Sequence, residues 1–80
     1  MNEKTLNHCL KFHEYIITSI SLSNKNVARR LSELGFYPGA YLRFIGISSL
    51  KKTFLIQIGG YTLSLHSSVG ELIFVREKWI

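Results

Sequence analysis

Residues 30–39 read RLSELGFYPG, a pattern that is typical of a helix end followed by the start of a strand. Gly35 follows the last residue of an apolar stripe, where a residue that is free to adopt positive φ ends a helix. Pro38 then prevents the helix from resuming. The stripe predicts a helix at about residues 24–34, because its apolar residues recur at i, i+4 and i+7 on one face. Its members are Val27, Leu31 and Leu34.

The chain before this helix has the composition of a β-strand. In residues 15–22 β-branched and aromatic side chains dominate, and Ile16, Ile20 and Leu22 share one face at a period of two. Ser23 is the expected N-cap of the helix, because its hydroxyl can accept a hydrogen bond from a free amide of the first turn.

The chain after residue 39 reads as β structure almost to its end. Gly59-Gly60 predicts a two-residue hairpin, because both glycines tolerate the positive φ of a primed turn. The four expected strands are residues 40–47, 53–58, 61–66 and 72–77. Five strands with one helix between the first two predict a mainly β domain, a small and strongly bent barrel.

Two short segments complete the prediction. Residues 1–13 are expected to form a short helical turn or an irregular lead-in. Residues 67–70 fit a single tight turn, for which 3₁₀ geometry is one option, with Ser68 and Glu71 at the spacing of a capping box.

The length and the net charge of the chain limit the kinds of partner that the protein is expected to bind. Eighty residues allow one domain, residues 1–80, and ten Lys and Arg against five acidic residues give a net charge of +5. This balance favours acidic partners such as nucleic acid, an anionic membrane or an acidic protein face. Cys9 is the only cysteine, and there is no secretory signal or long apolar run, so a reducing, cytoplasmic location is expected.

The sequence contains no pattern of catalytic residues. It lacks a Walker phosphate loop and a nucleophile elbow, so the protein is not expected to be an enzyme. No cofactor is evident and no metal site is assigned, because zinc needs clustered ligands at fixed spacings. His8, Cys9 and His13 form at most a weak transition-metal site, and His66 is expected to be half-exposed with a local hydrogen bond.

The positions of the aromatic residues allow two interpretations. Several of them interleave with Arg43, Lys51 and Lys52, as in nucleic-acid-binding sheets. In so short a chain most of these rings are expected in the core. The rings concerned are Tyr37, Tyr41, Phe44, Phe54, Tyr61 and Phe74. Phe36-Tyr37 is different: the pair follows a basic helix end and is expected to be exposed, as part of a protein-docking surface.

The segment at residues 30–39 resembles the RL-x-x-LG-x-x-PG signature of the ferrous iron transport protein A (FeoA) family. The resemblance extends over about residues 5–77, through the stretches 61–66 and 70–75. His66 stands where the family usually has a basic residue, and Gly70 where it usually has alanine. The loop at residues 48–52 lacks the Gly and Pro often found there.

This resemblance implies an SH3-like five-stranded β-barrel with one inserted helix at about residues 24–34. It also implies a small cytosolic accessory protein of ferrous iron uptake, a non-enzymatic module that docks on the cytosolic part of a FeoB-like transporter. No nucleic acid is then expected, and the membrane is reached only through the partner. The residues expected to form or shape the docking face are Arg29, Arg30, Leu34, Phe36, Tyr37 and Pro38. Those expected to make the turns are Gly35, Gly39, Gly59 and Gly60.

Two other functions stay open. The first is a small basic barrel that binds RNA or DNA through Arg43, Lys51 and Lys52. The second is a sensor or chaperone that binds ferrous iron or another transition metal weakly, through His8, Cys9, His13 or His66. In addition, the apolar Trp79-Ile80 tail is a candidate for self-association.

Overall fold

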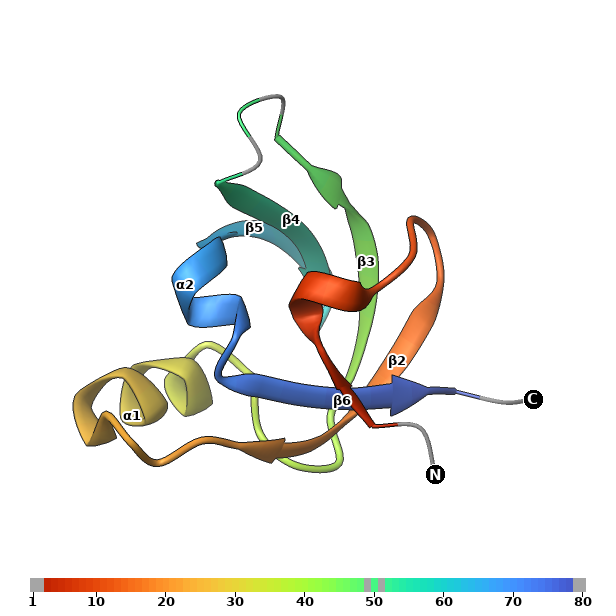
Figure 1. Cartoon of the computed structure of the whole chain (residues 1–80). Coiled ribbons are helices and arrows are strands. Elements are labelled where there is room, and N and C mark those ends of the chain that lie inside the picture. The colour runs from red at the N-terminus through yellow and green to blue at the C-terminus, as the bar shows by residue number, and fades with distance from the viewer. Residues whose placement is uncertain (1–2, 49, 51, 79–80) are drawn as a thin grey trace.

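The computed structural model describes residues 3–48, 50 and 52–78. The elements are β1 (Lys4–Thr5), the 3₁₀ helix η1 (Leu6–His8), β2 (Glu14–Ile20), α1 (Lys25–Glu33), β3 (Tyr41–Ile47), β4 (Thr53–Ile58), β5 (Tyr61–His66), α2 (Ser67–Gly70) and β6 (Ile73–Glu77) (Figure 1). Lys51 and the Trp79-Ile80 tail lie outside the described residues, so the roles expected of them stay predictions.

All six strands belong to one antiparallel sheet, in the order β1-β6-β2-β3-β4-β5. Its register shifts twice, between Ile17 and Ser19 and between Phe44 and Gly46. Such bulges bend a strand and increase its twist, and Figure 1 shows the sheet curving around η1 and α2. The mainly β, SH3-like prediction with one inserted helix is confirmed. The pairing of the described strands leaves β1 and β5 as edges, so hydrogen bonds do not close the barrel.

The core holds thirteen buried apolar side chains, which come from every strand from β2 to β6 and from η1, α1 and the turn after α1. They are Leu6, Tyr15, Ile17, Leu31, Phe36, Leu42, Phe44, Phe54, Ile56, Ile58, Leu65, Ile73 and Val75. The hairpin predicted at Gly59-Gly60 is present, with φ of +60° and +91°. β4 and β5 have the predicted bounds, and β3 and β6 each begin one residue later than predicted.

The face shared by Ile16, Ile20 and Leu22 is not the fully buried face of the first strand. Tyr15 and Ile17 point into the core, whereas Ile16 is only half-buried. The run Tyr15-Ile16-Ile17 is apolar on both faces, so its period does not identify the inner one. Beyond the bulge the strand ends at Ile20, and Leu22 is 69% exposed in the connection to α1.

Both predicted helix caps are wrong by one or two residues. The Val27 amide donates to Asn24 Oδ1 at 3.2 Å, so Asn24 rather than Ser23 caps α1. At α2 the Ser68 amide donates to His66 Nδ1 at 3.1 Å, and this histidine replaces the expected capping box. Asn24 directly precedes α1 and His66 directly precedes α2, so each is the residue placed to accept from the free amides of the first turn.

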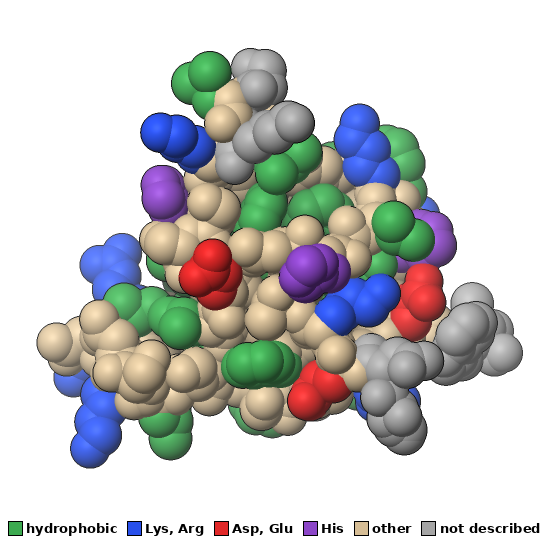
Figure 2. Space-filling model, viewed as in Figure 1, with side chains coloured by type: hydrophobic (Ala, Val, Ile, Leu, Met, Phe, Trp, Pro, Cys, Tyr) green, Lys and Arg blue, Asp and Glu red, His purple; other side chains and the backbone are tan. Residues whose placement is uncertain are grey.

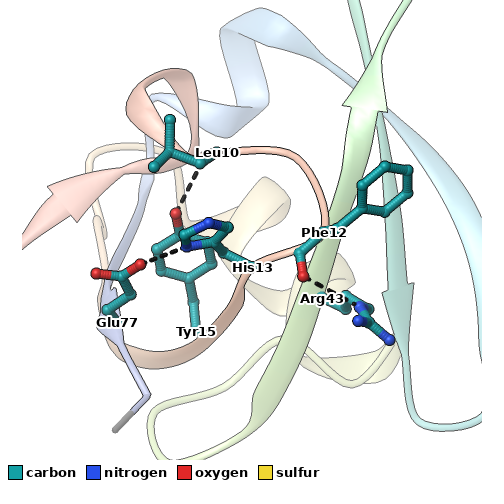
Figure 3. A network of polar contacts seen from close by, with 6 residues as sticks. All are labelled: Leu10, Phe12, His13, Tyr15, Arg43 and Glu77. Atoms are coloured by element: carbon teal, nitrogen blue, oxygen red, sulfur yellow. Dashed lines mark hydrogen bonds and ion pairs between the residues drawn. The ribbon is translucent and has the colours of Figure 1, made fainter.

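The N-terminal segment is more ordered than predicted. β1 pairs with β6, with Lys4 opposite Val75, and Leu6 in η1 is fully buried. The loop that follows is held by the buried Tyr15, whose hydroxyl accepts a hydrogen bond from the Leu10 amide at 2.8 Å (Figure 3). A two-residue strand is too short to produce a period, which is why the sequence did not indicate β1.

Gly70 explains one departure from the family pattern. It is buried, and a Cβ added there would lie 2.4 Å from Phe54 Cε2. The Phe54 ring is itself fixed in the core beside Phe44, with 5.5 Å between the ring centroids. The space that the usual alanine would take is therefore filled by an aromatic ring from β4.

Replacing Gly70 with alanine is expected to destabilise the fold by about 1–3 kcal/mol, because the Phe54 ring must shift in a packed core. In the double variant with Phe54→Leu the loss is expected to be smaller than the sum of the two single losses, since a smaller side chain vacates the space. Urea unfolding of the four proteins measures this coupling. Strictly additive losses would show that Phe54 is not what excludes the methyl group.

Candidate docking site

Helix α1 ends in a hydrogen-bonded motif that the sequence around Gly35 requires. Gly35 has φ of +104°, and its amide donates to the Ser32 carbonyl at 3.1 Å. The next amide, of Phe36, reaches back to the Leu31 carbonyl at 2.8 Å. These two bonds define a Schellman motif, which is normally accompanied by an apolar contact between the same two outer residues. Here both Leu31 and Phe36 belong to the core.

The next four residues form a type II turn. The Ala40 amide donates to the Tyr37 carbonyl at 3.0 Å, with Pro38 at the second position and Gly39, at φ +97°, at the third. Two further backbone hydrogen bonds of 2.8 Å join this turn to β2. The Gly39 amide donates to the Ile17 carbonyl, and the Ile17 amide donates to the Ala40 carbonyl. The chain between α1 and β3 is therefore fixed at both ends.

This geometry separates Phe36 from Tyr37. Phe36 is 0% exposed, so the expectation that it lies on the surface is wrong, and it can shape the docking face only from beneath. Tyr37 is 53% exposed, and the other expected docking residues are also at the surface. These are Arg29, Arg30, Leu34 and Pro38.

A cleft of about 480 Å³ lies between the end of α1, the turn before β3 and the β4–β5 hairpin. Leu34 and Tyr37 line it, as do Tyr41 and Tyr61, two tyrosines that were expected among the core rings. These two rings are 55% and 46% exposed. Phe44 and Phe54, by contrast, are buried as expected.

Tyr61 connects the hairpin to the helix. Its hydroxyl donates a hydrogen bond to the Leu34 carbonyl, one of the groups left without a partner at a helix end. The two residues are 27 positions apart, so no local pattern indicates this contact. The only available signal is that Tyr61 directly follows Gly59-Gly60, which places its ring at the hairpin end of the sheet.

Charged residues of both signs lie near the cleft. Arg29 and Arg30 are exposed on the last turns of α1, and Lys78 Nζ lies 4.5 Å from the centre of the Tyr41 ring. Lys78 also contacts Glu14, with 3.7 Å between Nζ and Oε1. Glu33 is the acidic residue in the lining of the cleft. An aromatic cleft beside arginines is a typical composition for the centre of a protein interface.

The expected metal ligands do not form a cluster. Among the residues that the structure describes, no three His, Cys, Asp or Glu side chains are placed to hold one ion. His13 Nδ1 lies 2.5 Å from Glu77 Oε2, so one ring nitrogen of His13 is engaged by a carboxylate (Figure 3). Burial raises the pKa of the Cys9 thiol to about 12, which disfavours the thiolate that binds metals. His66 is exposed and caps α2, the local role expected for it.

The expected nucleic-acid residues are spread along β3 and the β3–β4 loop. Arg43 is exposed and donates from Nε to the Phe12 carbonyl at 3.3 Å, and Lys52 is exposed on the loop. Tyr41 and Arg43 line a shallow furrow of about 200 Å³ that continues the cleft along β3.

The sequence matches the FeoA domain family over residues 4–77. This range includes the capped helix, the turn and the hairpin described above. The chain belongs to the FeoA domain family. Membership of this family implies an accessory role in ferrous iron transport. A search of curated proteins finds no match to the sequence.

Solved structures share this fold. An FeoA-like protein of Clostridium acetobutylicum is 20% identical with a TM-score of 0.86, and the match covers 100% of this chain and 92% of that one. FeoA of Chlorobium tepidum is 24% identical with a TM-score of 0.84, over 92% and 70% of the two chains. A manganese-dependent transcriptional repressor in complex with manganese is 19% identical with a TM-score of 0.89. That match covers 98% of this chain but 38% of the repressor, so this FeoA domain corresponds to one part of that protein.

No helix within residues 3–48, 50 and 52–78 is long and apolar enough to cross a membrane.

Truncating Phe36 to alanine is expected to destabilise this FeoA domain by about 3–5 kcal/mol, because a fully buried ring is lost. Tyr37→Ala is expected to change stability by no more than about 0.5 kcal/mol, since half of that ring is in solvent. Urea unfolding measures both. Equal losses at the two neighbouring positions would contradict the separation of the pair into core and surface.

Stability is expected to fall at alkaline pH. The thiol of Cys9 stays neutral in the folded protein up to about pH 12 because it is buried, whereas the unfolded thiol ionises above roughly pH 8.5. The unfolded state therefore gains stability as the pH rises between these values. Burial raises the pKa of Tyr15 as well, so Cys9→Ala is expected to remove only part of the effect. Urea midpoints at about pH 8 and 10 give the comparison. If the urea midpoints of the natural protein and of Cys9→Ala fell equally between these pH values, this account would be contradicted.

Proposed function

We propose that this FeoA domain docks through its tyrosine cleft on the cytosolic part of a FeoB-like transporter and so supports ferrous iron uptake. The tyrosine cleft is lined by Leu34, Tyr37, Tyr41 and Tyr61, and Arg29 and Arg30 are exposed on α1, whose C-terminal end borders the cleft. The observation that carries the proposal is the open aromatic cleft, which lies on the segment that identifies the family.

The chemistry of the cleft supports a protein partner. Tyrosine presents a large, stiff surface that is apolar on its face and polar at its tip, and tyrosine and arginine are the residues most enriched at the centres of interfaces. The tyrosine cleft is also held rigid, because Tyr61 bonds to the helix end and the turn bonds to Ile17. A rigid surface loses little conformational entropy on binding.

The size of the domain agrees with this use. A stable interface buries about 800 Å² on each partner, which is about one-seventh of the 5298 Å² surface of this chain. The exposed arginines and the net charge of +5 favour an acidic face on the partner and speed the encounter.

The test is calorimetric titration of the purified domain with the isolated cytosolic part of the FeoB-like transporter from the same source. The double variant Arg30→Glu with Tyr37→Ala is expected to bind at least about tenfold more weakly, because it removes an anchor ring and reverses a charge. Lys52→Glu is the matched control: it reverses a charge at the opposite end of β3 and is expected to bind within about twofold of the natural protein. Unchanged binding by a folded double variant would overturn the proposed surface.

A further inference from the structure

The end of the molecule opposite the tyrosine cleft exposes a second set of apolar side chains. Phe12 is 61% exposed on the loop before β2, and Leu50 is 79% exposed on the β3–β4 loop. Between these loops, Ile47 and Leu55 are exposed on the outer face of the sheet. We call these four residues the apolar end.

The backbone of Phe12 has an unfavourable conformation. Its φ of +67° lies in the left-handed region, which bulky residues rarely adopt, and it is the only described non-glycine residue with positive φ. Its amide donates to the Phe44 carbonyl at 2.6 Å, and its carbonyl accepts from Arg43 (Figure 3). Glycine or asparagine would suit this conformation better, so a phenylalanine whose ring lies in solvent calls for a contact beyond the chain itself.

The two loops belong to one surface. The Lys11 side chain lies along β3, so that a Cβ added at Gly46 would be 3.3 Å from Lys11 Cε. A shallow hollow of about 310 Å³ joins Lys11, Ile47 and Leu55 on the outer face of β3 and β4. The apolar end is therefore continuous from the Phe12 loop across the sheet to the start of the β3–β4 loop.

The strands β3, β4 and β5 carry only basic charges, although Glu14 lies opposite Arg43 in the sheet and Glu77 bonds to His13, the neighbour of Phe12. No acidic residue occurs between positions 34 and 70, which include β3, β4, β5 and both of their connections. The described cations around the apolar end are Lys11, Arg43 and Lys52, all exposed. Figure 2 shows hydrophobic and basic side chains together at the end with the β3–β4 loop, and acidic side chains across the middle of the face and below it.

We propose that the apolar end is a contact surface for an anionic lipid bilayer. Apolar side chains at the tips of separate loops can enter the boundary between headgroups and acyl chains, and the surrounding lysines are attracted by anionic headgroups. Phe12 and Leu50 project from separate loops beside the exposed Lys11 and Lys52, an arrangement that suits the boundary of an anionic bilayer. Membrane contact would then not depend on the partner alone, which differs from the expectation drawn from the family resemblance.

This inference goes beyond the docking function and does not rest on it. With the apolar end on the bilayer, the tyrosine cleft at the other end of β3 points into the solvent. A domain held in this way would present the cleft to protein that projects from the same membrane.

The test is sedimentation of the full chain with phosphatidylglycerol vesicles and, in parallel, with phosphatidylcholine vesicles. The natural protein is expected to bind the anionic vesicles at least about tenfold more tightly than the neutral ones. The double variant Phe12→Asn with Leu50→Ser is expected to lose about tenfold or more of that affinity, because two inserted apolar side chains are gone. Asparagine tolerates the left-handed conformation, so this variant keeps the fold.

Leu22→Ser is the matched control, because it removes another largely exposed leucine, from the connection between β2 and α1. It is expected to bind like the natural protein. Absence of binding to anionic vesicles at low salt overturns the proposal, as does an equal loss in the control. So does binding of a single-stranded oligonucleotide in place of vesicles. The calorimetric test uses a soluble partner, so its failure is distinguishable from failure here.

Discussion

The hydrogen bond from the Phe36 amide to the Leu31 carbonyl fixes the path of the chain on which the rest of the domain depends. It forms because Gly35 takes a left-handed conformation, and it brings Phe36 into the core beside Leu31. The following residue must then face outwards, and Pro38-Gly39 turns the chain directly into β3. One capped helix end thus sets the core contact, the exposed tyrosine and the start of β3.

β3 connects the two surfaces of the molecule. Its first residue, Tyr41, lies in the tyrosine cleft, and its last, Ile47, belongs to the apolar end. Successive side chains of a strand point to opposite faces. Leu42 and Phe44 therefore pack in the core, whereas Tyr41 and Ile47 point outwards at the two ends of β3. A rigid strand of seven residues therefore keeps the two surfaces apart, at roughly 20 Å by the rise of an extended chain.

The features that could be predicted from the sequence are those with local signals, such as the helix stop at Gly35 and the hairpin at Gly59-Gly60. The burial of Phe36 could also have been predicted. An apolar residue that directly follows a capping glycine and lies five positions after Leu31 is the expected apolar partner of Leu31 in a Schellman motif. The bond from Tyr61 to Leu34 could not have been predicted, because it joins distant parts of the chain through the tertiary fold. Tyr41 and Tyr61, half of the residues named as lining the cleft, were not predicted to be there. In a short chain most aromatic rings are expected in the core, and only the fold shows which of them reach solvent.

The most direct test is a map of the partner surface by nuclear magnetic resonance. The ¹⁵N-labelled chain would be titrated with the unlabelled cytosolic part of the FeoB-like transporter, and amide shifts would be followed residue by residue. Our account predicts the largest changes at Gly35, Tyr37, Tyr41 and Tyr61, around the tyrosine cleft. Changes confined to η1 and α2, with the cleft unaffected, would contradict it.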